Sequence, residues 1–179
     1  MGVNSWRASF LVPLAQMTFV GVFEEVLCRG VIFRTLEKSL GSAVALVVSS
    51  LLFSLGHMPG DSLSALALLN TVIAGAFLAM AFVLTRHLWL CLGIHIAWNY
   101  TLGTVFSLVV SGRSNDGLLS GKLIGASWLT GVSYGVEGSL ATSMVFIVAS
   151  VCFGWRTIVA GNWVGIPKTF MLRFLPKAT

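Results

Sequence analysis

Charged side chains are scarce in this sequence, which has 179 residues and only 9% Asp, Glu, Lys and Arg. A soluble domain carries roughly 25%, so this chain has too few charges to cover a surface that faces water. Hydrophobic residues make up 56% of the chain, and its mean hydropathy is +0.92. The composition excludes an ordinary water-soluble globule, a disordered tail and a nucleic-acid binder built on a basic face. It predicts an all-α integral membrane protein.

Cysteine is also rare, and its three positions share no disulfide or metal-binding spacing. Cys28, Cys91 and Cys152 each stand alone in an apolar run, and no Cys-x-x-Cys pair occurs. We interpret them as small packing residues. The start of the sequence lacks a basic segment followed by an apolar run and a small-residue cleavage site, so it is not typical of a removable signal peptide.

Long uncharged runs organise the chain. Five of them contain 16 to 26 residues, and a helix needs about 20 apolar residues to cross the hydrocarbon core. They predict one membrane domain over residues 1–179, a polytopic bundle of about five crossings at 9–33, 42–58, 63–85, 89–110 and 138–157. The Gly- and Ser-rich segment 111–136 predicts a loop, with a short re-entrant or interfacial piece near 123–129. Residues 161–179 form a basic C-terminal tail.

Basic residues are unevenly divided between the two ends of this bundle. With five alternating crossings, one end holds Arg7, Arg113 and Lys122, together with Asp61, Asp116 and Glu137. The other end holds Arg34, Lys38, Arg86, Arg156, Lys168, Arg173 and Lys177. The positive-inside rule places this second end, with the C-terminus, on the cytoplasmic side. The net charge of +5 therefore indicates the lipid bilayer, and not nucleic acid, as the partner.

Three polar clusters interrupt the apolar segments. They are Glu-Glu-x-x-x-Arg at 24–29, Phe-x-x-x-His at 53–57 and His-x-x-x-Asn at 95–99. Ionisable groups inside a bilayer are costly, so they mark either a functional site or an internal ion pair. Each cluster contains two residues that are four apart, which places them on one helix face. The pairs are Glu25 and Arg29, Phe53 and His57, and His95 and Asn99.

Helical geometry separates the roles of the first two carboxylates. Glu25 and Arg29 have the spacing of an intrahelical ion pair, whereas Glu24 lies about 100° around the helix and points elsewhere. If the first two crossings turn near 39–42, Glu24 and His57 lie equally far from that turn and meet at one membrane depth. A carboxylate and an imidazole at one depth can together activate a water molecule.

His95 fits this arrangement less well. It lies nine residues beyond Arg86, roughly 13 Å at the helical rise, whereas His57 lies at the far end of its own crossing. Straight helices would separate the two imidazoles in depth. A tilted or shortened third crossing would bring them together, and so would a fourth crossing that begins deep in the protein.

The three clusters, in this order and inside membrane segments, resemble the signature motifs of the CPBP intramembrane proteases. That family includes type II CAAX prenyl endopeptidases and bacterial relatives linked to bacteriocin processing and self-immunity. The neighbours Arg29-Gly30-Val31-Ile32-Phe33 and Ser49-Ser50-Leu51-Leu52-Phe53 agree, and the resemblance covers about residues 20–103. It implies a helical membrane bundle with a polar site in a cavity, and it favours the bacterial cytoplasmic membrane as location.

The resemblance also implies roles for individual residues. Glu24 corresponds to the catalytic glutamate and His57 to its partner in activating water, while His95 and Asn99 correspond to the oxyanion-stabilising pair. Glu25 and Arg29 would support the site. The implied function is endoproteolysis of a membrane-associated peptide or protein, such as a prenylated CAAX-type or leader-peptide substrate.

Other interpretations stay open at this point. Glu24, His57 and His95 could supply oxygen and nitrogen ligands to zinc, although no His-Glu-x-x-His motif is present, and we favour a mechanism without a cofactor. A proton-relaying transporter fragment would use the same ionisable groups, but the sequence has no repeated half. A non-catalytic membrane scaffold or immunity protein would keep the motifs for stability alone.

Overall fold

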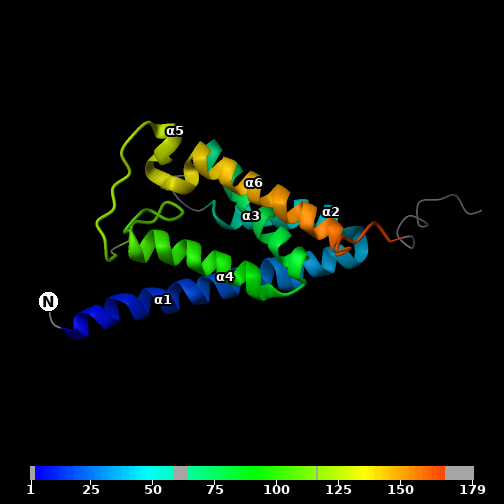
Figure 1. Ribbon diagram of the computed structural model, residues 1–179, viewed down its shortest axis with the longest axis horizontal. Coiled ribbons are helices and arrows are strands. Elements are labelled where there is room, and N and C mark those ends of the chain that lie inside the picture. Colours follow the sequence, from blue (N-terminus) through cyan, green and yellow to red (C-terminus); the bar gives the residue numbers. More distant parts are fainter. Residues whose placement is uncertain (1–2, 59–63, 116, 168–179) are drawn as a thin grey trace, which may run out of the picture.

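The computed structural model describes residues 3–58, 64–115 and 117–167, and it is built of helices that lie side by side (Figure 1). Those residues contain no β-strand, only an isolated bridge between Val110 and Arg113. Large apolar side chains remain on the outside, for example Phe19 (73% exposed) and Val151 (65%). An apolar exterior of this kind suits lipid and not water. The protein is an all-helical membrane protein, as its composition predicts.

The first two predicted crossings form one long hairpin. It comprises α1 (Val3–Glu25), a π-helical segment (Val26–Phe33) and α2 (Arg34–Gly56). The chain reverses inside the predicted turn, at Gly41, whose backbone angles are φ 82° and ψ 170°. A side chain is strained in this left-handed region, and a Cβ atom at Gly41 would lie 2.9 Å from the backbone of Gly165.

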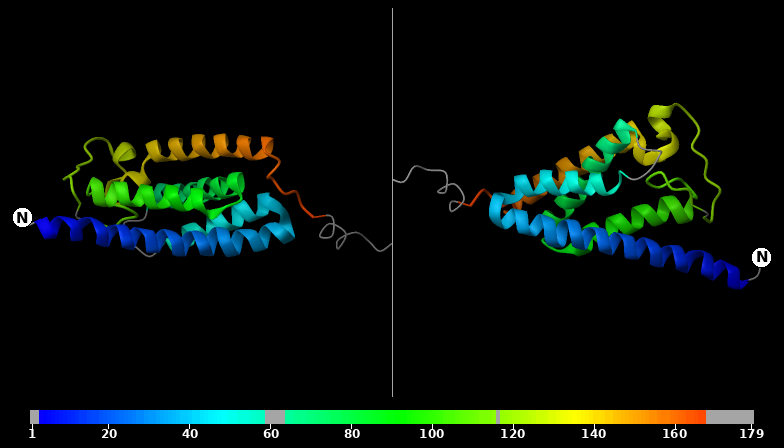
Figure 2. Two further views of the ribbon diagram at one scale, coloured as in Figure 1. Left: turned by 60° about the horizontal axis from the view of Figure 1, so that its bottom comes forward. Right: turned by 180° about the vertical axis from the view of Figure 1, so that it is seen from behind.

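Helix α3 (Ala65–Thr85) occupies the centre of the bundle. It packs against α2 on one side and against α4 (Leu88–Asn99) and α6 (Leu140–Val159) on the others. Figures 1 and 2 show α1 and α6 on opposite sides, with α4 between them. Aromatic and small side chains fill the core, among them Phe33, Phe53, Phe77, Phe82, Cys91 and Phe146.

Three helical stretches of the described residues are long and apolar enough to cross a membrane, namely 10–56, 65–85 and 140–159. The first contains two predicted crossings, and the other two match the predictions at 63–85 and 138–157. The predicted crossing at 89–110 is too long. Its helix continues α4 through a π-helical segment (Tyr100–Val105) and ends there. This stretch is not among the three candidate spans.

The segment between Val105 and Leu140 is mostly irregular. It contains the one-turn helix α5 (Ser127–Thr130) and two 3-10 turns, Val132–Tyr134 and Val136–Gly138, and folds back over one end of the bundle (Figure 2). Of the predicted loop and tail residues, those outside the described part of the chain are Asp61, Asp116, Lys168, Arg173 and Lys177. The cysteines are unpaired; Cys28 and Cys91 are buried, and Cys152 is exposed.

Candidate active site

The three polar motifs meet at one level of the bundle. Glu24 lies in the last turn of α1, His57 follows α2 and His95 lies on α4. The Oε2 atom of Glu24 is 3.8 Å from Nε2 of His57 and 3.7 Å from Nε2 of His95. These separations exceed a direct hydrogen bond and suit a third polar atom, such as the oxygen of a water molecule, between the side chains.

The reversal at Gly41 explains the first of these contacts. Glu24 and His57 lie 17 and 16 residues from Gly41 along the two arms of the hairpin. Because both arms are helical, equal numbers of residues place both side chains at nearly the same height. The predicted meeting of this carboxylate and imidazole is confirmed.

The position of His95 along the bundle axis is set by the position of the turn between α3 and α4. That turn at Arg86 does not lie level with Gly41: the Arg86 carbonyl accepts a 3.5 Å hydrogen bond from Arg34. His95 lies nine residues beyond Arg86, and Glu25 lies nine residues before Arg34. The third crossing is therefore shorter than the hairpin beside it, which brings His95 level with Glu25.

Glu25 and Arg29 form the predicted ion pair, with 2.8 Å between Oε1 and Nη1, and both side chains are completely buried. Arg29 also donates from Nη2 to the Gly75 carbonyl on α3 at 2.7 Å, and its guanidinium lies 4.6 Å from the centre of the Phe53 ring. The same Oε1 atom of Glu25 lies 2.9 Å from Nδ1 of His95. Glu25 therefore links the ion pair to the imidazole.

Hydrogen bonds assign the proton positions on both imidazoles. Nδ1 of His57 lies 2.9 Å from the Phe53 carbonyl, which only accepts, so Nδ1 carries the proton. Nδ1 of His95 donates in the same way to the Glu25 carboxylate. In both rings Nε2 is thus the atom that faces Glu24. A neutral ring accepts a proton there, and an imidazolium donates one.

Asn99 lies one turn beyond His95 on α4 and is buried, with 9% of its surface exposed. It lines two hollows that meet at this level, as His57 and Ser111 also do. The first is a small cavity of about 60 Å³, whose apolar wall includes Phe53, Ala74, Phe77, Leu78, Ile94 and Phe146. The second is a groove of about 480 Å³ between α1 and the loop, walled by Gln16, Met17, Val20, Arg113, Ser114 and Asn115.

The three side chains of the site differ in how much of their surface is exposed. The side chain of Glu24 is 26% exposed, that of His57 17% and that of His95 7%. Glu24 also lines the groove, whereas His95 lines only the small apolar cavity. The carboxylate is therefore the more accessible group of the site, and the His95 ring is the more buried one.

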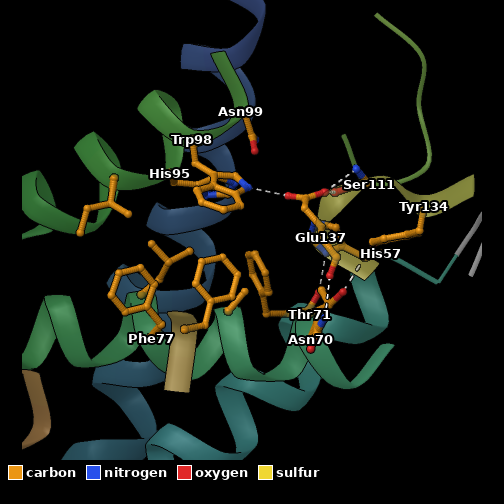
Figure 3. A pocket seen from close by; sticks show the side chains of 15 residues that line it. His57, Asn70, Thr71, Phe77, His95, Trp98, Asn99, Ser111, Tyr134 and Glu137 are labelled. Carbon is orange, nitrogen blue, oxygen red and sulfur yellow. Dashed lines mark hydrogen bonds between the residues drawn. The ribbon is translucent and has the colours of Figure 1, made fainter. Parts of the chain in front are cut away.

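Glu137 belongs to the cavity wall, whereas its sequence context predicts only a charge at one end of the bundle. Its Oε1 atom accepts the indole N–H of Trp98 at 2.8 Å, and Oε2 accepts the backbone N–H of Ser111 at 2.5 Å (Figure 3). Its carbonyl accepts from Asn70 on α3. Glu137 follows no helical spacing from the three motifs, so no signal in the sequence identifies it.

Tyr134 closes the cavity beside Glu137. Its hydroxyl lies 3.4 Å from that of Thr71. Burial, partly offset by neighbouring hydroxyls, raises the pKa of Tyr134 above its ordinary value. The phenol therefore keeps its proton at neutral pH and can act as a hydrogen-bond donor.

Glu24, His57 and His95 are the side chains that would hold a zinc ion in the alternative mechanism. Within residues 3–58, 64–115 and 117–167, no group of three His, Cys, Asp or Glu side chains is arranged to hold a metal ion. Both Nε2 atoms face Glu24, but a water molecule or substrate oxygen fits the 3.7–3.8 Å separations described above.

Comparison with protein families gives one match. The model of the type II CAAX prenyl endopeptidase Rce1-like family matches residues 6–101, which is more than half of the chain and includes all three motifs. No curated protein and no solved structure matches the chain. The family is one of membrane proteases, in agreement with the helical bundle and its buried polar site. The chain belongs to the Rce1-like family of type II CAAX prenyl endopeptidases.

Proposed function

We propose that this protein is an intramembrane endopeptidase that hydrolyses a peptide bond with a water molecule activated by Glu24 and His57. One observation carries the proposal: a single carboxylate oxygen, Oε2 of Glu24, lies within 4 Å of two imidazole nitrogens from two other helices. That oxygen is buried and receives no hydrogen bond from the described residues. A polar atom without a partner in a buried site favours a functional role.

The water molecule would lie between Glu24 and Nε2 of His57. It gives one proton to the Glu24 carboxylate while its oxygen attacks the carbonyl carbon of the substrate. When the tetrahedral intermediate collapses, the C–N bond breaks and Glu24 returns the proton to the leaving amine. His57 holds the water through Nε2, because its Nδ1 proton is committed to the Phe53 carbonyl.

Asn99 and His95 would stabilise the negative charge that develops on the carbonyl oxygen. Asn99 supplies an amide N–H. His95 donates from Nε2 only as an imidazolium, because its Nδ1–H already faces Glu25. The Glu25 carboxylate orients the ring for this contact, with its Oε1 atom 2.9 Å from Nδ1.

The two hollows indicate how a substrate would lie. A peptide backbone fits the larger groove beside Glu24, and the small apolar cavity accepts an apolar side chain next to the scissile bond. We therefore propose a membrane-associated peptide or protein as the substrate.

The proposal is tested by cleavage of a fluorogenic library of membrane-associated peptides that includes CAAX-type sequences. We expect Glu24→Gln and His57→Ala to lower the rate by about 10²–10⁴-fold, the usual contribution of a positioned general base. His87→Ala is the matched control, because His87 is exposed at the start of α4, outside the site. Its rate should equal that of the wild type.

A chelator separates the metal-free mechanism from the zinc alternative. Cleavage that survives phenanthroline but is lost in Glu24→Gln supports the proposal. Loss in phenanthroline with recovery on adding zinc overturns the metal-free mechanism. Full activity of a folded Glu24→Gln variant overturns the assignment of the site.

A further inference from the structure

A second polar hollow lies far from Glu24, at the end of the bundle where the hairpin reverses at Gly41. It has a volume of about 330 Å³ and is bounded by α2 and the end of α3. One aromatic ring and four charged side chains line it: Phe82, Arg34, Glu37, Lys38 and Arg86. Three of the four charges are positive, and the proposed protease mechanism uses none of them.

The single carboxylate in this hollow, that of Glu37, accepts hydrogen bonds from Arg86 and Ser42. Its two oxygens accept hydrogen bonds of 2.9 Å and 2.7 Å from Nη1 and Nη2 of Arg86. Oε1 also accepts the hydroxyl of Ser42 at 2.5 Å. Glu37 is 4% exposed. Its negative charge is therefore paired with Arg86 and not with the other two cations.

Arg34 and Lys38 remain uncompensated. They lie four residues apart on α2, on the same helix face, and both are exposed. Neither makes an ion pair with a carboxylate of the described residues. The Arg34 guanidinium lies 5.2 Å from the centre of the Phe82 ring, which fixes its position at the wall of the hollow. Like charges at this spacing repel each other, so an anion between them would be stabilising.

The position of these cations along the hairpin indicates the kind of anion. Arg34 and Lys38 precede the reversal at Gly41 by seven and three residues, or about 10 and 5 Å at the helical rise. The π-helical segment that precedes Arg34 carries exposed apolar side chains, among them Val31 (54% exposed) and Leu27 (43% exposed). Two cations near the end of a membrane helix with exposed apolar side chains above them match a lipid, whose charged head and acyl chains occupy the same relative positions.

We infer that the hollow formed by Arg34, Lys38 and Arg86 binds the phosphate of an anionic membrane lipid, with its acyl chains along Val31 and Leu27. The planar guanidinium of Arg34 can bind two phosphate oxygens at once, and the Lys38 ammonium adds a point charge. Arg86, held in place by Glu37, forms the floor of the site.

The test measures lipid retention on the full-length protein in a neutral detergent by native mass spectrometry. Phosphatidylglycerol and phosphatidylcholine are titrated separately, and inorganic phosphate is added in a third series. We expect one phosphatidylglycerol to bind the wild type at least tenfold more tightly than phosphatidylcholine. Arg34→Gln and Lys38→Gln should each weaken that binding about fivefold or more, as expected for loss of one cation near an anionic headgroup.

Arg156→Gln is the matched control, because Arg156 is an exposed cation in the last turn of α6 and does not line the hollow. It should change phosphatidylglycerol binding by less than twofold. Equal losses in all three variants would show general attraction of charge and overturn the site. Equal binding of the two lipids would overturn it as well. Phosphate that displaces no lipid supports a lipid site, whereas phosphate that displaces it completely at millimolar concentration identifies a site for free phosphate and overturns the lipid assignment.

Discussion

Nδ1 of His95 and Nη1 of Arg29 share one oxygen, Oε1 of Glu25, at 2.9 Å and 2.8 Å. The sequence predicts only the second of these contacts. Glu25 therefore acts in two ways, as the counter-ion of a buried arginine and as the group that orients the imidazole facing Glu24.

Replacement of Glu25 should separate these two roles. Glu25→Gln leaves the Arg29 charge buried without its partner, so we expect the free energy of unfolding to fall by about 3–5 kcal/mol. Replacing both members of a buried pair with uncharged residues removes most of that cost. The double variant Glu25→Gln/Arg29→Met should recover stability, measured by unfolding in a denaturing-detergent titration.

The double variant should not recover cleavage, because His95 still lacks the carboxylate at Nδ1. If activity returned together with stability, Glu25 would serve the fold alone. Its link to His95 would then have no part in the reaction.

Glu137 offers a second test. Glu137→Ala leaves the N–H groups of Trp98 and Ser111 without their acceptor, and an unsatisfied buried donor costs about 1–3 kcal/mol. Ser111 also donates its hydroxyl to the same carboxylate oxygen at 3.1 Å, so the variant removes two hydrogen bonds from this loop residue. We expect lower thermal stability and reduced cleavage for Glu137→Ala, and a smaller effect for Trp98→Phe, which removes only one donor. Equal effects of the two variants would contradict a role for Glu137 in holding the loop.

The contact between α2 and α3 depends on Gly75. A Cβ atom at this position would lie 3.0 Å from Cα of Ser50, so Gly75→Ala must push the two helices apart. Overpacking of this kind costs about 1–3 kcal/mol, and it moves the carbonyl that anchors Arg29. Gly93→Ala is the matched control, because a Cβ atom there meets open space. Thermal unfolding should show a loss for the first variant and no loss for the second.

Two contacts of the candidate site could be predicted from the sequence. The pairing of Glu24 with His57 depends on local helix geometry and one turn at Gly41, and both can be counted along the chain. The pairing of Glu25 with Arg29 is likewise a matter of helical spacing. These contacts were predictable because regular helices convert residue number directly into height.

The height of His95 was not predictable, because it depends on where α3 ends relative to the hairpin. That register is fixed by Arg86 and Glu37, which are 49 residues apart and form the ion pair of 2.7 Å. The early end of the helix at Val105 and the contribution of Glu137 are also consequences of tertiary packing. None of these features leaves a periodic pattern in the sequence.

The orientation of the bundle stays a prediction from its basic residues. A membrane-impermeant maleimide applied to intact cells can test it in a Cys152→Ala background. Ser39→Cys and Ser120→Cys are a matched pair, since both serines are exposed and lie at opposite ends of the bundle. We expect labelling of Ser120→Cys alone, which would place the groove beside Glu24 on the non-cytoplasmic side. Labelling of Ser39→Cys alone would reverse this assignment.

Arg29 has a consequence for how the chain enters the membrane. An arginine at the centre of a membrane helix costs about 2.5–3.5 kcal/mol during insertion, and Glu25 and the Gly75 carbonyl provide its two hydrogen-bond acceptors. Gly75 is synthesised 46 residues after Arg29. The first hairpin is therefore synthesised before one of the two hydrogen-bond acceptors of Arg29. We expect its stable insertion into lipid to follow the synthesis of α3, the helix that carries Gly75.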